Sequence, residues 1–482
     1  FLKKKYKFDC KNNFESLWKW SVKNVEKFWD SVWIFTKIKG VKKNPILKKN
    51  KIFNKNVFFP NSKINYAKNI LVKKNNETAI QFFSENLSEK NITWKNLYDK
   101  VCKLSFFLKQ NGIKKNDRIA AYAPNSIETI IAFLASSKNG SIWSSCSPDF
   151  GVQGVVDRFL QIKPKILVTC NFYFYNGKKI NILKKIPSII KAIPSIKKII
   201  VFPYGKTLSK DSINKKKNYL DFNKIINNSK LDEKFEEFNF NHPIYILYSS
   251  GTTGNPKCIT HGTGNVLIEH KKEYILHCNI KNNDKVFYYT TTGWMMWNWL
   301  VGALSCGAKL FLFDGAPNYP SADILIKYCA LKKLTFFGVS SKYIDFLKNK
   351  KFNSKNYNLK NLKTIASTGS PLLKESFDYV YKSIKKNVHL ASISGGTDLV
   401  GCLVLGNLFS KVNSGEIQGE SLGINVDIFN NKGISVKNKN KGELVVKQPF
   451  PSMPIKFWND YKGIKYKAAY FNKFHNIWHH GD

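Results

Sequence analysis

Hydrophobic residues recur at three- and four-residue steps near the start of the chain. Between Phe14 and Ile38 these steps place seven apolar side chains on one face: Leu17, Trp18, Val22, Val25, Trp29, Val32 and Trp33. Such spacing predicts an amphipathic helix over this segment. Aromatic stripes of this kind usually pack into a core, so we expect the tryptophans to be buried.

Strands and helices alternate from about residue 91 onward. Thr93 precedes a helical segment over residues 94–110, and Gly112 ends it. Short apolar segments predict strands between further helices, and the clearest lie at residues 118–123, 141–145, 166–170 and 199–202. This alternation predicts α/β layers with parallel strands.

Two long segments depart from this alternation. Residues 205–240 are polar, rich in lysine and asparagine and weakly periodic, so we expect an excursion over the surface. Residues 294–313 approach the length of a membrane span, but Asn298, two glycines and Lys309 interrupt them. Their second half, residues 308–313, predicts a separate strand. We therefore expect no membrane-spanning segment and no membrane partner.

The composition predicts folded cores rather than a disordered chain. Hydrophobic residues make up 43% of the 482 residues, and aromatic residues make up 14%. The formal net charge of +45 is typical of proteins that bind a nucleic-acid backbone. Only Arg118 and Arg158 are arginines, however, whereas phosphate and base recognition favours the bidentate guanidinium group. The lysines are scattered, so we interpret them as solvated surface residues and expect no nucleic-acid partner.

The cysteines and histidines predict a reduced protein without a zinc site. Nine cysteines are dispersed along the chain and none has the C-x-x-C spacing, which is typical of reduced thiols in a cytoplasmic protein. The eight histidines form no H-E-x-x-H motif, and His479 and His480 lie beside no cysteine or carboxylate cluster with zinc-ligand spacing.

The first candidate chemistry follows an apolar strand at residues 243–248. The strand runs directly into Ser-Ser-Gly-Thr-Thr-Gly-Asn-Pro-Lys, which occupies residues 249–257. Small residues leave backbone N–H groups unobstructed, hydroxyls supply further donors and Lys257 adds a cation, as a loop that wraps polyphosphate requires. The spacing differs from that of a Walker A loop. A Ser/Thr/Gly turn alone is most often only a loop, but the full string after a strand is far more specific.

This string resembles the signature loop of the adenylate-forming superfamily, which includes acyl-CoA synthetases, luciferases and peptide-synthetase adenylation domains. Three further segments resemble the superfamily in the same order along the chain. Residues 367–371 (STGSP) are similar to its adenine-binding segment, residues 394–398 (SGGTD) to its T-E/D motif, and residues 478–482 (WHHGD) to its ribose-binding G-D motif. Four motifs in this order identify the chain as a member of the superfamily.

Within the superfamily, the resemblance is closest to the acyl-CoA synthetases that activate acetoacetate. It covers almost the whole chain from about residue 14, and it is carried by the Trp-rich amino-terminal segment and by residues 143–151, 291–299, 393–398, 415–418 and 457–460. It implies an AMP-forming acid–thiol ligase that uses ATP, Mg²⁺ and coenzyme A to convert acetoacetate into its CoA thioester. The alternatives are an acetyl- or other short-chain acyl-CoA synthetase, or a non-catalytic nucleotide-binding module.

The resemblance also implies roles for individual residues. Lys257, Thr397 and Asp398 would be catalytic, with Lys257 near the β- and γ-phosphates, Thr397 donating to the α-phosphate and Asp398 holding Mg²⁺. The remaining nucleotide-binding residues would be Thr252, Thr253 and Gly254 at the phosphates, Gly369, Ser370 and Pro371 along the adenine, Gly396, and Asp482 at the ribose hydroxyls.

Two residues are predicted to shape the acyl pocket. Of the three tryptophans in the 291–299 segment we assign only Trp294 to the pocket, because runs of tryptophan are commonly core. In the similar acetyl-CoA synthetases a tryptophan occupies the place of Gly395, so the glycine implies a deeper pocket here. The alternative is that Gly395 and Gly396 allow a tight backbone turn before Thr397.

The implied fold is the large amino-terminal α/β domain of an adenylate-forming enzyme. We expect a Trp-rich helical segment over residues 1–60 and an AMP-binding adenylation domain over residues 61–482, built from two α/β subdomains and a smaller β-rich subdomain at about residues 390–482. Members of the superfamily continue into a hinge and a small carboxy-terminal lid domain, whose lysine contacts the reacting carboxylate. We expect that domain to lie outside the present sequence. The sequence predicts no particular oligomeric state.

Overall fold

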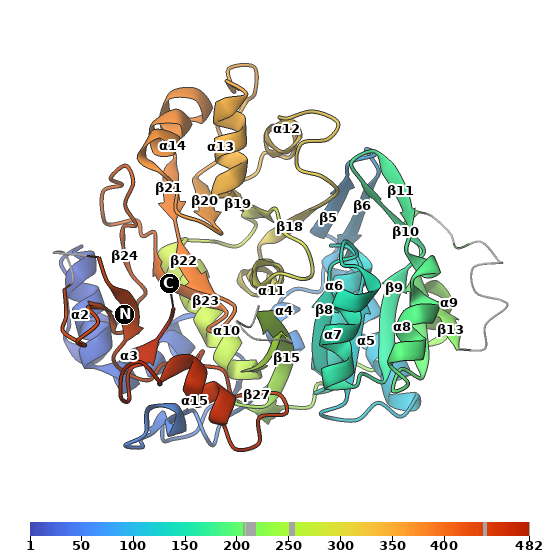
Figure 1. Cartoon of the computed structure of the whole chain (residues 1–482), viewed down its shortest axis with the longest axis horizontal. Helices are drawn as coiled ribbons and strands as arrows, with labels where there is room; N and C mark the ends of the chain where they lie inside the picture. Colours follow the sequence, from blue (N-terminus) through green and yellow to red (C-terminus); the bar gives the residue numbers. More distant parts are fainter. Residues whose placement is uncertain (206–207, 209–217, 250–255, 437–440, 482) are drawn as a thin grey trace.

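The structure is a computed structural model that describes residues 1–205, 208, 218–249, 256–436 and 441–481. Two large sheets organise this part of the chain, and helices cover them (Figure 1). The α/β architecture predicted from the alternation of strands and helices is confirmed. The parallel arrangement also holds through the centre of each sheet, whereas antiparallel pairs occur towards one edge.

The first sheet has eight described strands. In spatial order they are β13 (Tyr219–Asp221), β12 (Lys198–Phe202), β9 (Ile166–Cys170), β7 (Arg118–Tyr122), β8 (Ile142–Cys146), β15 (Pro243–Ser249), β16 (Lys257–Gly262) and β27 (Lys456–Phe457). Around them lie α5 (Trp94–Gln110), α6 (Ile127–Lys138), α7 (Val152–Ile162), α8 (Ile186–Ala192) and α9 (Phe222–Asn228). The predicted strands differ by one residue at one end from β7 and β12 and by one residue at each end from β8, and β9 and α5 match their predicted bounds.

The second sheet has seven described strands. Their order is β21 (His389–Ser392), β20 (Thr364–Thr368), β19 (Phe336–Ser340), β17 (Lys285–Tyr288), β18 (Lys309–Asp314), β5 (Thr78–Ser84) and β6 (Glu89–Thr93). The helices in the same part of the chain are α10 (Thr263–Lys272), which continues into the π-helix η4 (Glu273–His277), and α11 (Met295–Gly302), η5 (Ala303–Cys306), α12 (Ile324–Lys332), α13 (Ser341–Asn349), α14 (Lys374–Tyr379) and η6 (Val380–Ile384).

Small sheets and short helices complete the described structure. Two three-stranded sheets lie in the last hundred residues: β22 (Ser394–Gly396), β23 (Gly401–Leu405) and β24 (Gly419–Glu420); and β25 (Val426–Phe429), β26 (Glu443–Val446) and β28 (Trp478–His479), with α15 (Ile464–Tyr470) nearby. The others are β1 (Gly40–Val41) with β4 (Lys63–Ile64) and β14 (Phe238–Asn239), β2 (Leu47–Lys48) with β3 (Val57–Phe58), and β10 (Phe172–Tyr175) with β11 (Lys178–Asn181). Short helices are α1 (Leu2–Tyr6), η1 (Phe53–Lys55), α4 (Tyr66–Ile70) and η2 (Ile182–Lys184).

The amino-terminal stripe forms two helices rather than the single predicted one. Helix α2 spans Phe14–Lys23 and α3 spans Val25–Phe35, with Asn24 between them at φ −116° and ψ 51°. The Trp20 carbonyl oxygen accepts both the backbone N–H of Asn24 at 2.9 Å and its side-chain amide at 3.2 Å, so Asn24 ends α2 with two hydrogen bonds to one carbonyl group. The burial prediction is nevertheless confirmed, because Trp18, Trp29 and Trp33 are all buried in the main core.

The prediction that residues 205–240 make a surface excursion is wrong for residues 219–228, whereas residues 229–237 are irregular and exposed or half-buried, as expected. Residues 219–221 form β13 at the edge of the eight-stranded sheet, paired in parallel with β12. Helix α9 then buries Phe222, Ile225 and Ile226. Lysine and asparagine dominate the local composition, so these few apolar positions were too sparse to predict a strand and a helix. Residues 206–207 and 209–217 lie outside the described residues.

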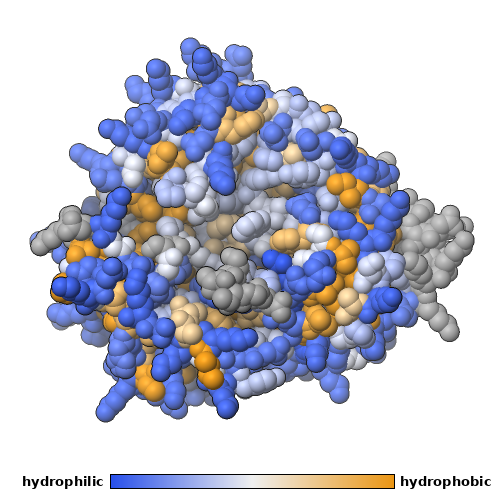
Figure 2. All heavy atoms as spheres, in the orientation of Figure 1, coloured by the Kyte–Doolittle hydropathy of each residue, from blue (hydrophilic) through white to orange (hydrophobic). Residues whose placement is uncertain are grey.

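The apolar segment over residues 294–313 folds as α11, η5 and β18. Within the described residues, no helix is both long and apolar enough to cross a membrane. Hydrophilic side chains predominate on the face shown in Figure 2, with hydrophobic residues in scattered patches. All nine cysteines lie in the described part of the chain, and each is a free thiol.

Candidate active site

A pocket of about 730 Å³ opens at the end of the seven-stranded sheet. Its walls come from the start of α11, the loop after β20, and the segment from the end of β21 through β22 to the start of β23. Seven residues predicted from three separate motifs line this one pocket: Trp294, Gly369, Ser370, Pro371, Gly395, Gly396 and Thr397. Segments that are a hundred residues apart in sequence therefore meet at one concave site.

Other predicted residues do not line this pocket or lie outside the described residues. Lys257 is half-buried at the first position of β16, opposite Ser249, the last residue of β15. These two residues mark where the predicted phosphate loop leaves and rejoins the sheet. Thr252, Thr253, Gly254 and Asp482 lie outside the described residues.

The predicted adenine wall is fixed by contacts behind it. Strand β20 ends at Thr368, whose hydroxyl donates to the Ile393 carbonyl oxygen at 3.0 Å. Gly369 then turns the chain at φ +90°, a conformation that glycine adopts without strain. The Ser370 hydroxyl lies 2.5 Å from the hydroxyl of Ser341, at the start of α13. The wall is therefore held between two strand ends and a helix terminus.

The T-D motif lies next to the last described residues of the chain. A side chain built at Gly396 would place its Cβ 3.2 Å from Cε1 of His480 and 3.6 Å from Oδ2 of Asp398. Asp398 is half-buried, and its Oδ1 accepts a hydrogen bond from the Tyr470 hydroxyl. Two motifs about eighty residues apart thus meet at Gly396.

Gly395 does not deepen the pocket in the predicted way. It pairs with Cys402 between β22 and β23, and a Cβ at Gly395 would lie 2.0 Å from the Gly401 carbonyl oxygen and 2.6 Å from Cα of Cys402. A side chain at this position would therefore point into the backbone of the neighbouring strand. Glycine here permits close approach of two paired backbones, which is a backbone role but differs from the tight turn before Thr397 that was the alternative.

The three tryptophans of the 291–299 segment differ in their surroundings. Trp297 and Trp299 are buried, which confirms their prediction as core residues. Trp294 caps the start of α11, lines the pocket and is 67% exposed. Sequence reasoning missed Met295, Met296 and Cys402, which line the same pocket. The pattern held no signal that would separate them from ordinary core residues.

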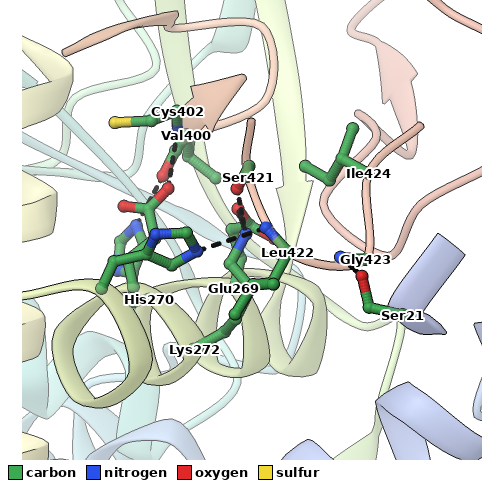
Figure 3. A network of polar contacts seen from close by, with 12 residues as sticks. Ser21, Glu269, His270, Lys272, Val400, Cys402, Ser421, Leu422, Gly423 and Ile424 are labelled. Atoms are coloured by element: carbon green, nitrogen blue, oxygen red, sulfur yellow. Dashed lines mark hydrogen bonds and ion pairs between the residues drawn. The ribbon is translucent and has the colours of Figure 1, made fainter. Parts of the chain in front are cut away.

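A buried polar network supports the turn between β22 and β23 (Figure 3). Nε2 of His270 lies 2.7 Å from the Val400 carbonyl oxygen. The Glu273 carboxylate accepts hydrogen bonds from the backbone N–H of Cys402 at 2.6 Å and from the Trp299 indole at 2.7 Å. Helix α10 and η4 therefore hold the backbone that forms one wall of the pocket.

The network extends through a buried ion pair to the amino-terminal helices. Lys272 and Glu269 are both fully buried and lie 2.6 Å apart. Lys272 also donates to the Ser421 hydroxyl at 2.5 Å, and the N–H of Gly423 donates to the Ser21 hydroxyl on α2 at 2.8 Å. Charged residues on a helix normally indicate a solvated face, which is why the sequence did not reveal this network.

Burial shifts the pKa values of several groups near this network. It raises the pKa of Glu273 well above its usual range, and the nearby Glu269 carboxylate adds to this shift. Burial lowers the pKa of His270 to about 4 and those of His261 and His277 to about 3. At neutral pH these three imidazoles are therefore uncharged.

The shifted pKa of His270 predicts a loss of stability in acid. Its folded-state pKa of about 4 lies below the ordinary 6.5, so the unfolded chain binds the proton more tightly. The stabilisation is present above pH 6.5 and is lost as the pH falls towards 4. Between pH 7 and pH 4, the free energy of unfolding of wild type should fall by up to about 3 kcal/mol more than that of His270→Gln.

Urea denaturation of both proteins at several pH values measures this difference. The pKa of Glu273 is raised rather than lowered, so its contribution to stability changes with pH in the opposite direction to that of His270. The two proteins are therefore compared at matched pH, rather than reading the wild-type profile alone. Parallel profiles for wild type and His270→Gln would show that His270 does not titrate differently on folding.

Comparison with known proteins agrees with this geometry. Residues 69–453 match the family of AMP-binding enzymes, and the chain belongs to that family. The acetoacetyl-coenzyme A synthetase of Rhizobium meliloti (strain 1021) is 43% identical over 471 residues, which cover 98% of this chain and 72% of that protein. The acetoacetyl-CoA synthetase of Gallus gallus is 41% identical over 479 residues, with coverage of 98% and 72%.

A solved structure shows the same arrangement. The acetoacetyl-CoA synthetase from Streptomyces lividans superposes with a TM-score of 0.94 at 31% identity, covering 100% of this chain and 74% of that one. Within the AMP-binding enzymes, the chain therefore belongs with the acetoacetyl-CoA synthetases.

Proposed function

We propose that this chain activates acetoacetate with ATP and transfers it to coenzyme A, releasing AMP and diphosphate. The observation that carries the proposal is the convergence of residues 294–296, 369–371 and 395–397 on one pocket, in a chain 43% identical to an acetoacetyl-CoA synthetase. A carboxylate oxygen of acetoacetate attacks the α-phosphorus, diphosphate leaves, and the thiol of coenzyme A then displaces AMP from the acyl carbon. Positioning and charge neutralisation are the protein's main contributions.

The residues of the pocket divide these tasks. Thr397 supplies a hydroxyl donor for the α-phosphate, and Gly396 beside it leaves room for the nucleotide. Gly369, Ser370 and Pro371 border the adenine. Thr252, Thr253 and Gly254 hold the β- and γ-phosphates, Lys257 neutralises part of their charge, and Asp482 accepts hydrogen bonds from the ribose. Trp294 flanks the acid at the mouth of the pocket.

The side chains at the pocket fit a magnesium ion carried by the nucleotide. Among the described residues no group of three histidine, cysteine, aspartate or glutamate side chains could hold a metal by itself. Asp398 offers one carboxylate next to Gly396, and Mg²⁺ commonly binds through one or two carboxylates plus substrate phosphates. When bound, the ion would neutralise phosphate charge.

The partners in this proposal are small molecules. Acetoacetate, ATP and coenzyme A are the substrates, and nucleic acid and membrane have no part in the reaction. The free cysteines support a cytoplasmic location.

The choice of acid tests the proposal. Diphosphate release by the product of the complete gene should be dependent on added acid, and kcat/KM for acetoacetate should exceed that for acetate or 3-hydroxybutyrate by about tenfold or more. A preference for acetate would make the protein an acetyl-CoA synthetase. ATP binding without turnover of any acid would instead make it a nucleotide-binding module.

A further inference from the structure

The Asp398 carboxylate has two oxygens in different surroundings. Its Oδ1 accepts the hydrogen bond from the Tyr470 hydroxyl. Its Oδ2 lies on the side of Gly396, 3.6 Å from where a Cβ at that glycine would be, and Gly396 lines the pocket. The oxygen nearer Gly396 is therefore the one that Tyr470 does not occupy.

Tyr470 is held rigidly behind the pocket. It is the last residue of α15, is 2% exposed, and stacks on Trp478 with ring centroids 3.8 Å apart and planes 13° apart. Trp478 is fully buried, and its neighbour His479 is fixed through β28. The Tyr470 ring also meets Tyr466 edge-on at 5.0 Å. With its ring clamped in this way, the hydroxyl has little freedom to move away from Asp398.

The chemistry of the pair is one-directional. In this hydrogen bond the Tyr470 hydroxyl is the donor and the Asp398 carboxylate is the acceptor. A neutral donor orients the carboxylate without cancelling its negative charge, which remains available to a cation.

We propose that Tyr470 is a positioning residue that fixes the Asp398 carboxylate so that Oδ2 faces a magnesium–nucleotide complex in the pocket. This inference rests on the proposed role of Asp398 and assigns a new role to a residue outside the four sequence motifs. It also explains why α15 lies against β28: the helix end and the terminal strand together place one hydroxyl beside the T-D motif. Without that hydroxyl, the carboxylate must be ordered by the cation itself.

The test replaces Tyr470 by phenylalanine, which removes the hydroxyl and keeps the ring. Tyr466→Phe is the matched control, because Tyr466 is also buried, lies one turn away on α15 and donates its hydroxyl to the Pro454 carbonyl oxygen at 3.1 Å instead. Isothermal titration calorimetry measures ATP binding with and without Mg²⁺, and thermal unfolding checks each variant. The binding measurement needs no turnover.

Tyr470→Phe should lose about tenfold in the affinity gained from Mg²⁺, while ATP binding without Mg²⁺ stays within about twofold of wild type. Tyr466→Phe should keep the full gain. An unchanged Mg²⁺ effect in Tyr470→Phe, or equal losses in both variants, would overturn the proposal.

Asp398→Asn separates failure of this inference from failure of the proposed function. If Asp398→Asn leaves the Mg²⁺ effect intact, the assumed role of Asp398 is wrong and the inference about Tyr470 falls with it. If Asp398→Asn abolishes the effect but Tyr470→Phe does not change it, only the role of Tyr470 is wrong. If Tyr470 acts through Asp398, the double variant Tyr470→Phe/Asp398→Asn should show almost the same Mg²⁺ effect on ATP affinity as Asp398→Asn alone.

Discussion

Replacing Asp398 with asparagine should lower acetoacetate-dependent diphosphate release roughly 100-fold, with little change in the thermal unfolding midpoint. The substitution removes one negative charge next to Gly396 but keeps the shape and an oxygen that can accept the Tyr470 hydrogen bond. Stability therefore changes little, whereas any cation shared with the nucleotide loses its protein ligand. Initial rates at saturating ATP across a range of Mg²⁺ concentrations measure the effect.

The control for this variant is Asp378→Asn. Asp378 is exposed and accepts a hydrogen bond from Ser414 at 2.8 Å, so the same chemical change occurs at a residue that does not line the pocket. Its activity should equal that of wild type. Full activity of Asp398→Asn at ordinary Mg²⁺ concentrations would show that Asp398 only shapes the turn.

Gly395→Ala should destabilise the protein by about 3 kcal/mol and lower kcat/KM for acetoacetate and acetate by the same factor. The added methyl group would lie 2.0 Å from the Gly401 carbonyl oxygen, so β22 and β23 must separate and carry Thr397 with them. Gly395→Trp should behave in the same way but more severely. Urea denaturation and parallel assays with both acids measure the two effects.

Gly151→Ala provides the comparison for Gly395→Ala. Gly151 has ordinary backbone angles, φ −65° and ψ 163°, and a Cβ there would meet no other heavy atom within 4 Å. The stability and the kcat/KM values of Gly151→Ala should be close to those of wild type. A stable Gly395→Ala variant that loses acetoacetate activity selectively would instead restore the interpretation of Gly395 as the determinant of pocket depth.

Local signals in the sequence predicted much of the fold. Helix α5 has a side-chain cap from Thr93 to the N–H of Asn96 at its start, and β9 is a continuous buried apolar run, so both were predicted with their observed bounds. The break at Asn24 depends on the backbone angles of one residue inside a continuous apolar stripe, which the spacing of apolar residues does not reveal. The strand β13 depends on pairing with β12, which lies nearly twenty residues earlier and leaves little local signal.

The site shows the same division between local and long-range information. Motif resemblance identified residues 369–371 and 395–397, which line the pocket, because they belong to short contiguous motifs of small and hydroxyl-bearing residues. The roles of Glu273 and Tyr470 depend on contacts across 129 and 72 residues. The orientation of a Cβ at Gly395 depends on pairing between β22 and β23, which no composition or spacing reveals.

The most direct test of the proposed function is to incubate the product of the complete gene with ATP, Mg²⁺, acetoacetate and coenzyme A, and to quantify the products by mass spectrometry. Acetoacetyl-CoA and AMP should form in equal amounts, with neither product accumulating when acetoacetate is left out. Formation of ADP instead of AMP, or no thioester from acetoacetate under conditions where acetate yields one, would contradict the proposed reaction.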